Sequence, residues 1–330
     1  MYGPWSMGGI GGELGHLAPP ALLVHGGAGT FAGLEEPSHA LALADELAAA
    51  LEAGWSVLSG TGNALEAVTV AVESLENSGR FNAGRGAVPT LDGTVELDAS
   101  VMDTAGRLGA VAAVRLAANP VRLARRVAEL GGLPGGPVLL AGEGADRLAE
   151  ADGNRKTKPM ELTGVAHVDD APPPPAPAPG DPSGGSPHGT VGAVAVDASG
   201  AMAAATSTGG RSGQMLGRVG DTPVFGAGIW AAPSTVAVSA TGTGEVFVYT
   251  GFAHRIDWLL REGHDIAAAT EEALASIAAH GGEGGAIAVR PDGSFAARFN
   301  SRAMLRGWRD RHAAVTRVTE QPSTTAAGPG

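Results

Sequence analysis

The sequence predicts an α+β fold in which antiparallel sheets are covered by helices. Strand-like stretches come in pairs joined by short turns: DTAGR follows residues 95–101, and residues 197–200 follow residues 190–196. Apolar residues at helical spacing occur in both halves of the chain. Hairpins join neighbouring antiparallel strands, whereas a parallel sheet needs long crossovers, so this pattern argues against a doubly wound parallel sheet.

The chain opens with a strand and two helices. Residues 21–24 are a short apolar run that ends in the glycine-rich turn HGGAG. Residues 38–59 carry apolar side chains at helical spacing, and Ser38 is suited to cap that helix. A second helix is predicted over residues 64–75, where Asn63 is suited to the N-cap and a long apolar face indicates packing on a sheet.

The remaining elements follow the same logic. Residues 95–101 alternate apolar and polar side chains, which predicts a strand with two different faces. Further strands are predicted over residues 108–114, 138–141, 190–196, 201–207, 235–241, 285–290 and 294–299. Further helices are predicted over residues 120–130, 144–151, 245–261 and 265–280.

Composition excludes several classes of protein. The 330 residues are 44% hydrophobic, enough for one large core or two domains, and the net charge of −12 without a basic stripe argues against nucleic acid as a partner. The absence of cysteine excludes disulfides, thiol catalysis and thiolate metal sites. No apolar run approaches the roughly 18–20 residues of a membrane span, and residues 1–20 lack the features of a signal peptide. We therefore expect a cytoplasmic protein with no membrane partner.

Three segments have compositions that are unsuited to a hydrophobic core. We interpret residues 1–20 as a flexible N-terminal extension, within which Met7 is an alternative start. Residues 152–189 combine the charged patch GNRKTKPME with the tract APPPPAPAPGDPSGGSP, which predicts a proline-rich linker. The tail from about Thr316 is expected to be disordered.

The linker ends at a bond that suits self-cleavage. A threonine hydroxyl is a weak nucleophile that needs a base. If the chain is cut between Gly189 and Thr190, Thr190 gains an α-amine with a reference pKa of about 7.7–8.0, which can serve as that base. A free N-terminal threonine is a known variant of the nucleophile–base pair. The alternative interpretation of Thr190 is a β-branched residue that begins a strand.

Several motifs, in order, carry a family resemblance. VHGGAG and FNAGRGAVPTLDGTVELDASVMD precede the bond, and HGTVGAV, ATSTGG, GRVGDTP and SATGTGEV follow it. Together they cover most of residues 21–305, and the chain resembles the plant-type asparaginase and isoaspartyl peptidase family of N-terminal nucleophile hydrolases. The segment RSGQML departs from the family, which often has Asn-Lys there, and this departure concerns substrate preference.

The resemblance implies an architecture and a reaction. The fold would be a four-layer αββα sandwich, cleaved into an α subunit of residues 21–189 and a β subunit of residues 190–330 that together form one domain. The enzyme would hydrolyse β-aspartyl dipeptides and asparagine through an acyl-enzyme on Thr190, without a required cofactor. The family commonly assembles as a dimer of cleaved αβ units.

The resemblance also assigns roles to individual residues. Thr208 would orient the nucleophile, and Thr241 and Gly242 would form the oxyanion site within the TGTG turn that ends at Gly244. Asn82 would reach the site from the first subunit. The catalytic and substrate-binding set is therefore expected to be Thr190, Thr208, Thr241, Gly242, Gly244 and Asn82, together with the two charged residues described next.

Arg218 and Asp221 are opposite charges three residues apart. Arginine offers a fork for a carboxylate and aspartate can hold an ammonium, so the two can clamp an aspartyl unit. The alternative is a surface ion pair worth about 0–1 kcal/mol. With the resemblance, the clamp is the preferred interpretation.

A structural sodium ion is a further implication of the resemblance. It would lie within the loop after the second helix and bind main-chain oxygens, a site that needs no signature side chain. The carbonyls carried over are those of Leu75, Glu76, Ser78, Phe81, Ala83 and Arg85.

Other interpretations stay open at this stage. Within the enzyme class, the chain could be a glycosylasparaginase or a taspase-like protease, and outside it an uncleaved binding or scaffold homologue. The histidines show no HxxxH or HxH pairing, so His25 and His188 are expected to be structural or solvent-facing. The turn GGAGTFAG at residues 26–33 is followed by Pro37 rather than by an immediate helix, which argues against dinucleotide binding.

Overall fold

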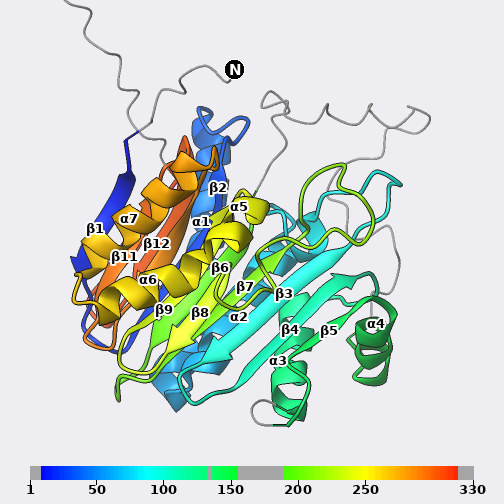
Figure 1. The fold of residues 1–330 in the computed structure, drawn as a ribbon, viewed down its shortest axis with the longest axis horizontal. Helices are drawn as coiled ribbons and strands as arrows, with labels where there is room; N and C mark the ends of the chain where they lie inside the picture. Colours follow the sequence, from blue (N-terminus) through cyan, green and yellow to red (C-terminus); the bar gives the residue numbers. More distant parts are fainter. Residues whose placement is uncertain (1–8, 132–134, 155–188, 319–330) are drawn as a thin grey trace, which may run out of the picture.

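The computed structural model describes residues 9–131, 135–154 and 189–318 and contains two stacked sheets between layers of helices (Figure 1). The larger sheet has the strand order β13-β12-β2-β6-β7-β3-β4-β5, and the smaller has the order β1-β11-β10-β9-β8. Every neighbouring pair is antiparallel except β4 and β5, which are parallel. The predicted α+β fold with antiparallel central sheets is confirmed.

The larger sheet mixes strands from both halves of the chain. β2 lies between β12 and β6, and β3 pairs with β7, so neither half can complete this sheet alone. Its strands are β2 (Ala21–Gly29), β3 (Leu97–Asp103), β4 (Leu108–Val114), β5 (Leu139–Ala141), β6 (Val191–Val196), β7 (Met202–Thr208), β12 (Ala303–Arg309) and β13 (Ala314–Arg317).

The smaller sheet takes all but one of its strands from the second half. The strands are β1 (Gly11–His16), β8 (Ile229–Ala232), β9 (Val236–Gly242), β10 (Gly284–Val289) and β11 (Ser294–Phe299). Apolar side chains between the two sheets form a core of their own, which includes Leu23, Val194 and Ile287. This inner core holds the two sheets face to face.

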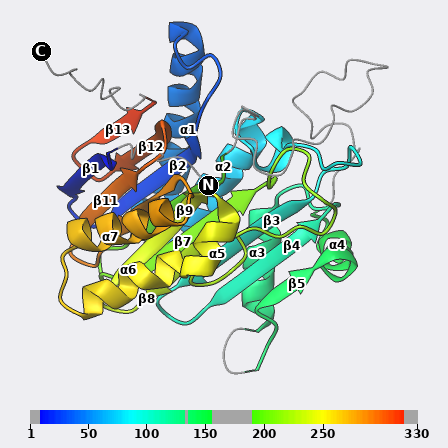
Figure 2. The same ribbon diagram turned by 45° about the horizontal axis from the view of Figure 1, so that its top comes forward.

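Helices cover the outer face of each sheet (Figure 2). The larger sheet carries α1 (Pro37–Thr61), α2 (Ala64–Ser78) and α3 (Pro120–Leu130), with the 3-10 turn η1 (Gly84–Gly86) and α4 (Gly142–Ala151) beside them. The smaller sheet carries α5 (Gly244–Thr250), α6 (Phe252–Arg261) and α7 (Ile266–Ala279). A separate apolar core lies beneath each helical layer, so the layers follow the expected αββα order.

Local chemistry sets the ends of the helices that matter for the site. Asn63 caps α2 as predicted, because its Oδ1 accepts the Glu66 N–H at 3.0 Å. Gly79 ends the helix in the left-handed conformation. Gly251 takes φ +58 and divides α5 from α6, where the sequence predicted one helix over residues 245–261. Periodicity alone did not reveal this break because the apolar pattern continues across it.

The prediction of a flexible extension over residues 1–20 is wrong for its second part. Gly11–His16 forms β1 and pairs along its whole length with β11. The predicted disordered tail begins too early, since β13 extends to Arg317 and pairs with β12. β1 and β12 pair with strands far away in the sequence, β11 and β2, whereas β13 and β8 are short edge strands that pair with their sequence neighbours β12 and β9.

Two further expectations concern strand 95–101 and the linker. The strand lies at residues 97–103 and is buried on both faces, because the sheet is covered on both sides; its polar members are therefore buried as well. Of the linker 152–189, residues 155–188 lie outside the described residues. At its start, Asn154 accepts the Asn119 N–H at 3.0 Å.

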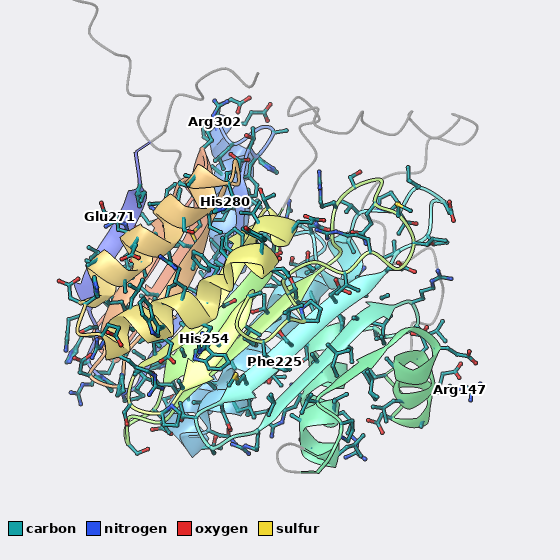
Figure 3. All side chains as sticks on the ribbon, in the orientation of Figure 1. Arg147, Phe225, His254, Glu271, His280 and Arg302 are labelled. Atoms are coloured by element: carbon teal, nitrogen blue, oxygen red, sulfur yellow. The ribbon has the colours of Figure 1, made fainter. Side chains whose placement is uncertain are left out.

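The histidines do not gather into a site in the part of the chain that the structure describes. Figure 3 shows His254 and His280 well apart, on α6 and just after α7. Within the described ranges, no group of three or more His, Cys, Asp or Glu residues could hold a metal ion. Over the same residues, no helix combines the length and apolar character needed to cross a bilayer.

Candidate active site

Thr190 lies at the start of the central strand β6 and is 8% exposed. Val191 pairs with Ser207 in the antiparallel ladder between β6 and β7, so the register sets Thr190 opposite Thr208 at the strand end. The pairing of β2 with β6 likewise brings the glycines after His25 alongside. The nucleophile predicted from sequence therefore lies where strands of both halves meet.

The segment HGGAG, predicted as a turn, is instead the second part of strand β2 and packs directly against the predicted cleavage bond. A Cβ added to Gly189 would lie 3.1 Å from the Gly26 carbonyl oxygen and 3.2 Å from Gly27 Cα. Such contacts are tighter than ordinary van der Waals packing, so a larger residue at position 189 would push this part of β2 away. The glycine before Thr190 thus has a packing reason as well as conformational freedom.

Thr208 and Asn82 are joined through one glycine turn. Thr208 Oγ1 accepts the Gly210 N–H at 3.0 Å, and the Asn82 amide donates to the Gly210 carbonyl at 2.7 Å. Asn82 Oδ1 also accepts the Val88 N–H at 3.0 Å. Asn82 reaches the site from the first half as expected, and here it holds the turn that follows Thr208. Direct contact of Asn82 with substrate stays a prediction.

The expected oxyanion residues lie at the end of β9. Thr241 is fully buried, and its Oγ1 accepts the Ala28 N–H at 3.2 Å. Gly242 takes φ +155, and a Cβ there would lie 2.4 Å from the Glu283 carbonyl oxygen. Only glycine fits that position, which leaves the main chain beside Thr241 without a covering side chain.

Arg218, Asp221 and Gly244 converge although they come from different segments. A Cβ at Gly244 would lie 2.9 Å from Asp221 Oδ1 and 3.0 Å from Arg218 Nη2. Arg218 also binds Glu245 Oε1 through Nε and Nη2, both at 2.9 Å, and donates from Nη1 to Gln214 Oε1 at 3.3 Å. Sequence analysis missed Glu245, although it is the residue after the glycine of the TGTG turn.

The Asp221 carboxylate is buried and has one unpaired oxygen, which suits it to bind a cationic group. It is 3% exposed, and its Oδ2 has no hydrogen-bond partner among the described residues. Burial raises the pKa of Asp221 to about 7; Arg218 opposes this shift, and the negative charges of Glu245 and Asp98 add to it. A buried carboxylate without a partner is costly, and an ammonium group would relieve that cost.

His25 is structural, in agreement with prediction. Its Nε2 lies 2.9 Å from the Ser239 hydroxyl, which in turn lies 2.8 Å from the Thr206 hydroxyl. Burial lowers the pKa of His25 to about 3, while a polar contact with the Thr190 main chain acts in the opposite direction. The imidazole is therefore neutral near pH 7, and it contacts the main chain of Thr190 just before β6 begins. His188 lies outside the described residues.

The loop expected to hold sodium presents main-chain oxygens at close range. A Cβ at Gly86 would lie 2.2 Å from the Phe81 carbonyl oxygen and 2.8 Å from that of Gly79. A Cβ at Gly84 would lie 2.7 Å from the carbonyl oxygen of Glu76. Oxygen ligands crowded at the negative end of a helix dipole suit a hard cation.

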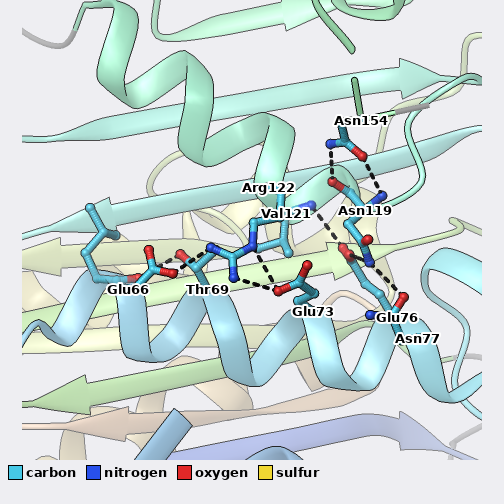
Figure 4. A network of polar contacts seen from close by, with 10 residues as sticks. Glu66, Thr69, Glu73, Glu76, Asn77, Asn119, Val121, Arg122 and Asn154 are labelled. Atoms are coloured by element: carbon cyan, nitrogen blue, oxygen red, sulfur yellow. Dashed lines mark hydrogen bonds and ion pairs between the residues drawn. The ribbon is translucent and has the colours of Figure 1, made fainter. Parts of the chain in front are cut away.

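The side chain of Glu76 joins a network with Asn119 and Val121 (Figure 4) and also contacts Ser207 in the second half of the chain. Its Oε1 accepts the Ser207 hydroxyl at 2.7 Å and the Val121 N–H at 3.0 Å, and its Oε2 accepts from Asn119 at 3.0 Å. Burial raises the pKa of Glu76 to about 7, and the hydrogen bonds act in the opposite direction. This network fixes the residue next to Thr208.

Comparison with known proteins identifies the family. The sequence model of the family described as Asparaginase matches residues 18–318. The chain is 42% identical over 298 residues to the isoaspartyl peptidase of Salmonella typhimurium, a match that covers 87% of this chain and 94% of that protein. It is also 42% identical over 306 residues to the plant-type L-asparaginase of Pyrobaculum calidifontis, covering 87% and 96%.

A vertebrate relative shows the same extent of similarity. The isoaspartyl peptidase/L-asparaginase of Danio rerio is 39% identical over 297 residues, which cover 86% of this chain and 90% of that protein. The family match over residues 18–318 spans both halves of the chain and includes every strand that contributes a residue to the site. The chain belongs to the asparaginase family that also contains the isoaspartyl peptidases.

Proposed function

We propose that this protein is a self-cleaving threonine hydrolase that acts on β-aspartyl dipeptides and L-asparagine. One observation carries the proposal: the register of β6 and β7 brings Thr190 opposite Thr208, in a chain whose buried Asp221 has an unpaired Oδ2 and lies beside Arg218. A nucleophile and a clamp for an amino acid are the two parts that such a reaction needs.

Cleavage of the precursor is the first step. The Thr190 hydroxyl attacks the Gly189 carbonyl carbon, and the C–N bond breaks to give an ester between Gly189 and Thr190. Breaking the C–N bond frees the α-amine of Thr190, which takes the proton from the hydroxyl. Water then hydrolyses the ester, releasing a carboxylate on Gly189 and restoring the Thr190 hydroxyl. That amine becomes the general base of the mature enzyme, with a reference pKa of about 7.7–8.0.

Substrate hydrolysis reuses the same hydroxyl. Arg218 would hold the substrate α-carboxylate and Asp221 its α-ammonium, which aims the side-chain amide at Thr190. Attack gives a tetrahedral oxyanion, which the Thr241 hydroxyl and the Gly242 N–H would stabilise. The amine or ammonia leaves with the proton taken from the nucleophile, and water then frees aspartate from the acyl-enzyme.

Intact mass under denaturing conditions tests the cleavage. From 32.7 kDa for 330 residues, cleavage before Thr190 gives chains of 189 and 141 residues, about 18.7 and 14.0 kDa. Thr190→Ala should stay whole after incubation near pH 7.5, and wild type should convert and then release aspartate from β-aspartyl dipeptides. A wild-type chain that stays whole and inactive would remove the base from this mechanism and favour a scaffold function.

The turn of residues 75–86 is the proposed site of a structural sodium ion. Crowding of main-chain oxygens around Gly84 and Gly86 supports it. Replacing NaCl with choline chloride at equal ionic strength should lower the melting temperature, and adding NaCl back should restore it. Equal melting in both salts would argue against a bound ion.

The cleaved αβ units are proposed to pair as a dimer. The comparisons support this assembly only through membership of the family. Size-exclusion chromatography with light scattering measures the mass of the cleaved protein, and a mass near that of a single αβ unit would argue against pairing.

A further inference from the structure

We infer that Glu96 and Asp98, both from the first half of the chain, are positioning residues for the substrate clamp in the second half. The inference rests on the proposed function, because it concerns the loop that carries Arg218 and Asp221. The sequence analysis assigned no role to either acid. Neither forms a hydrogen bond with Gly189 or Thr190 among the described residues.

The first attachment is made by Glu96, which is 4% exposed. Its Oε2 accepts the Gly217 N–H at 2.7 Å, immediately before Arg218. Its Oε1 is occupied by Arg115, at 3.1 Å from Nε and 2.7 Å from Nη2. One oxygen of the carboxylate is thus fixed by Arg115, the residue after β4, and the other oxygen holds the loop.

The second attachment is made by Asp98, two residues further along and therefore on the same side of the extended chain. Asp98 is 3% exposed, lies opposite Thr208 in the ladder between β3 and β7, and accepts the Ala113 N–H at 2.8 Å. The main chain of Gly220 is close enough to lower the pKa of Asp98, as is the guanidinium of Arg218. Glu96 therefore holds the loop at Gly217, and Asp98 lies beside it at Gly220, on the other side of Arg218.

A strained residue supports this arrangement. Ala113 takes φ +51, a left-handed conformation that is unfavourable for a non-glycine residue. The register between β3 and β4 shifts at this point, between Leu97 and Ala99. A bulge of this kind redirects a strand locally, and here it frees the Ala113 N–H for Asp98.

The rest of the loop is also attached to the first half. The Gly213 N–H donates to the Pro89 carbonyl and the Leu91 N–H donates to the Gln214 carbonyl, both at 2.9 Å. Residues 89–98 therefore contact residues 213–220 at several points along the loop. If the chain is cleaved before Thr190, the clamp is assembled across two subunits, and its aim depends on the first.

The experiment compares Asp98→Asn and Glu96→Leu with wild type at pH 8. Asparagine at position 98 loses the negative charge and replaces one carboxylate oxygen with a donor N–H₂ group, and leucine at position 96 accepts no hydrogen bond. We expect KM for a β-aspartyl dipeptide and the inhibition constant of L-aspartate to rise about tenfold or more, with kcat within about threefold. Glu96→Gln, which keeps an acceptor for Gly217, should rescue most of the affinity.

Asp103→Asn is the matched control. Asp103 is a buried acid at the other end of the same strand, 5% exposed, and its partners are Arg107 and its own turn. Its KM should stay at the wild-type value, and intact mass and thermal melting report whether each variant is cleaved and folded. If Asp98→Asn does not fold, the pair Glu96→Leu and Glu96→Gln decides the question.

Two results would overturn the inference. One is an unchanged KM and inhibition constant in both removal variants, and the other is an equal rise in Asp103→Asn. If wild type hydrolyses neither a dipeptide nor asparagine, the proposed function fails instead. Calorimetric binding of L-aspartate to wild type and variants would then still measure whether the two acids aim the clamp.

Discussion

The Arg218 guanidinium binds a single oxygen of Glu245, at 2.9 Å from both Nε and Nη2. Glu245 is the second residue of α5, and its side chain is 53% exposed. The nearby positive charge of Arg218 is the main cause that lowers the pKa of Glu245 against the opposing effect of burial. The pair fixes the Nε edge of the guanidinium. The opposite edge, formed by Nη1 and Nη2, faces away from Glu245 and can bind a ligand carboxylate, although Nη1 also donates to Gln214 at 3.3 Å.

Glu245→Ala should weaken substrate binding. A partly exposed ion pair is worth about 0–1 kcal/mol, so KM should rise by up to about fivefold while kcat changes little. Steady-state kinetics on a β-aspartyl dipeptide measures this. Glu272→Ala, which removes a similarly exposed partner of Arg255 at 2.7 Å on the outer helices, should leave KM unchanged. A fall in KM would mean that Glu245 competes with the substrate instead.

Thr241→Val should reduce kcat far more than it raises KM. The Thr241 oxygen accepts from Ala28, so its own proton remains available for the oxyanion, and losing one such donor costs about 10²–10³ in kcat. Single-turnover rates on cleaved protein give the value. Thr270→Val is the control, since that buried hydroxyl donates to the Ile266 carbonyl within α7. A variant with unchanged kcat would exclude Thr241 from the oxyanion site.

Binding of L-aspartate should weaken as the pH falls through about 7. The pKa of Asp221 is raised to about 7, so the carboxylate that faces the ligand ammonium takes up a proton below that value. The dissociation constant, measured by calorimetry from pH 8.5 to 5.5, should approach a tenfold rise per unit below the pKa. Arg218, Glu245 and Asp98 are the charged groups that act on Asp221.

The variant Asp98→Asn tests the direction of this pH dependence. It removes a negative charge that raises the pKa of Asp221, so the weakening should begin at lower pH in the variant. Affinity that is independent of pH in wild type would contradict a role for Asp221 in holding the ammonium.

Ala113→Gly should stabilise the protein by about 1 kcal/mol. Ala113 has φ +51, where a Cβ is unfavourable, and glycine relieves this at a smaller cost in chain entropy. Urea unfolding measures the free energy. Ser234→Gly provides a comparison at φ +65 in a surface turn. A loss of stability at position 113 would show that the bulge holds its alanine without strain.

Much of the fold could be predicted from local sequence. Asn63 and the apolar face of residues 64–75 predict α2, and short turns predict the hairpins of the central sheets, because caps and turns are local chemistry. What failed depends on distant partners. β1 is glycine-rich and gains its conformation from β11, and the parallel contact of β4 with β5 leaves no mark on either segment.

The site divides in the same way. The sequence by itself determined the candidate nucleophile, Thr190, and the charges of the clamp, because a residue type and its motif define what chemistry is available. Only the tertiary structure decided that Thr190 meets Thr208 across a ladder, that Glu245 occupies one edge of Arg218, and that Glu96 and Asp98 hold its loop. The physical reason is that strand register, side-chain contacts and burial are fixed only in the folded chain, where segments as far apart in sequence as Glu96 and Gly217 meet, and these set both distances and pKa values.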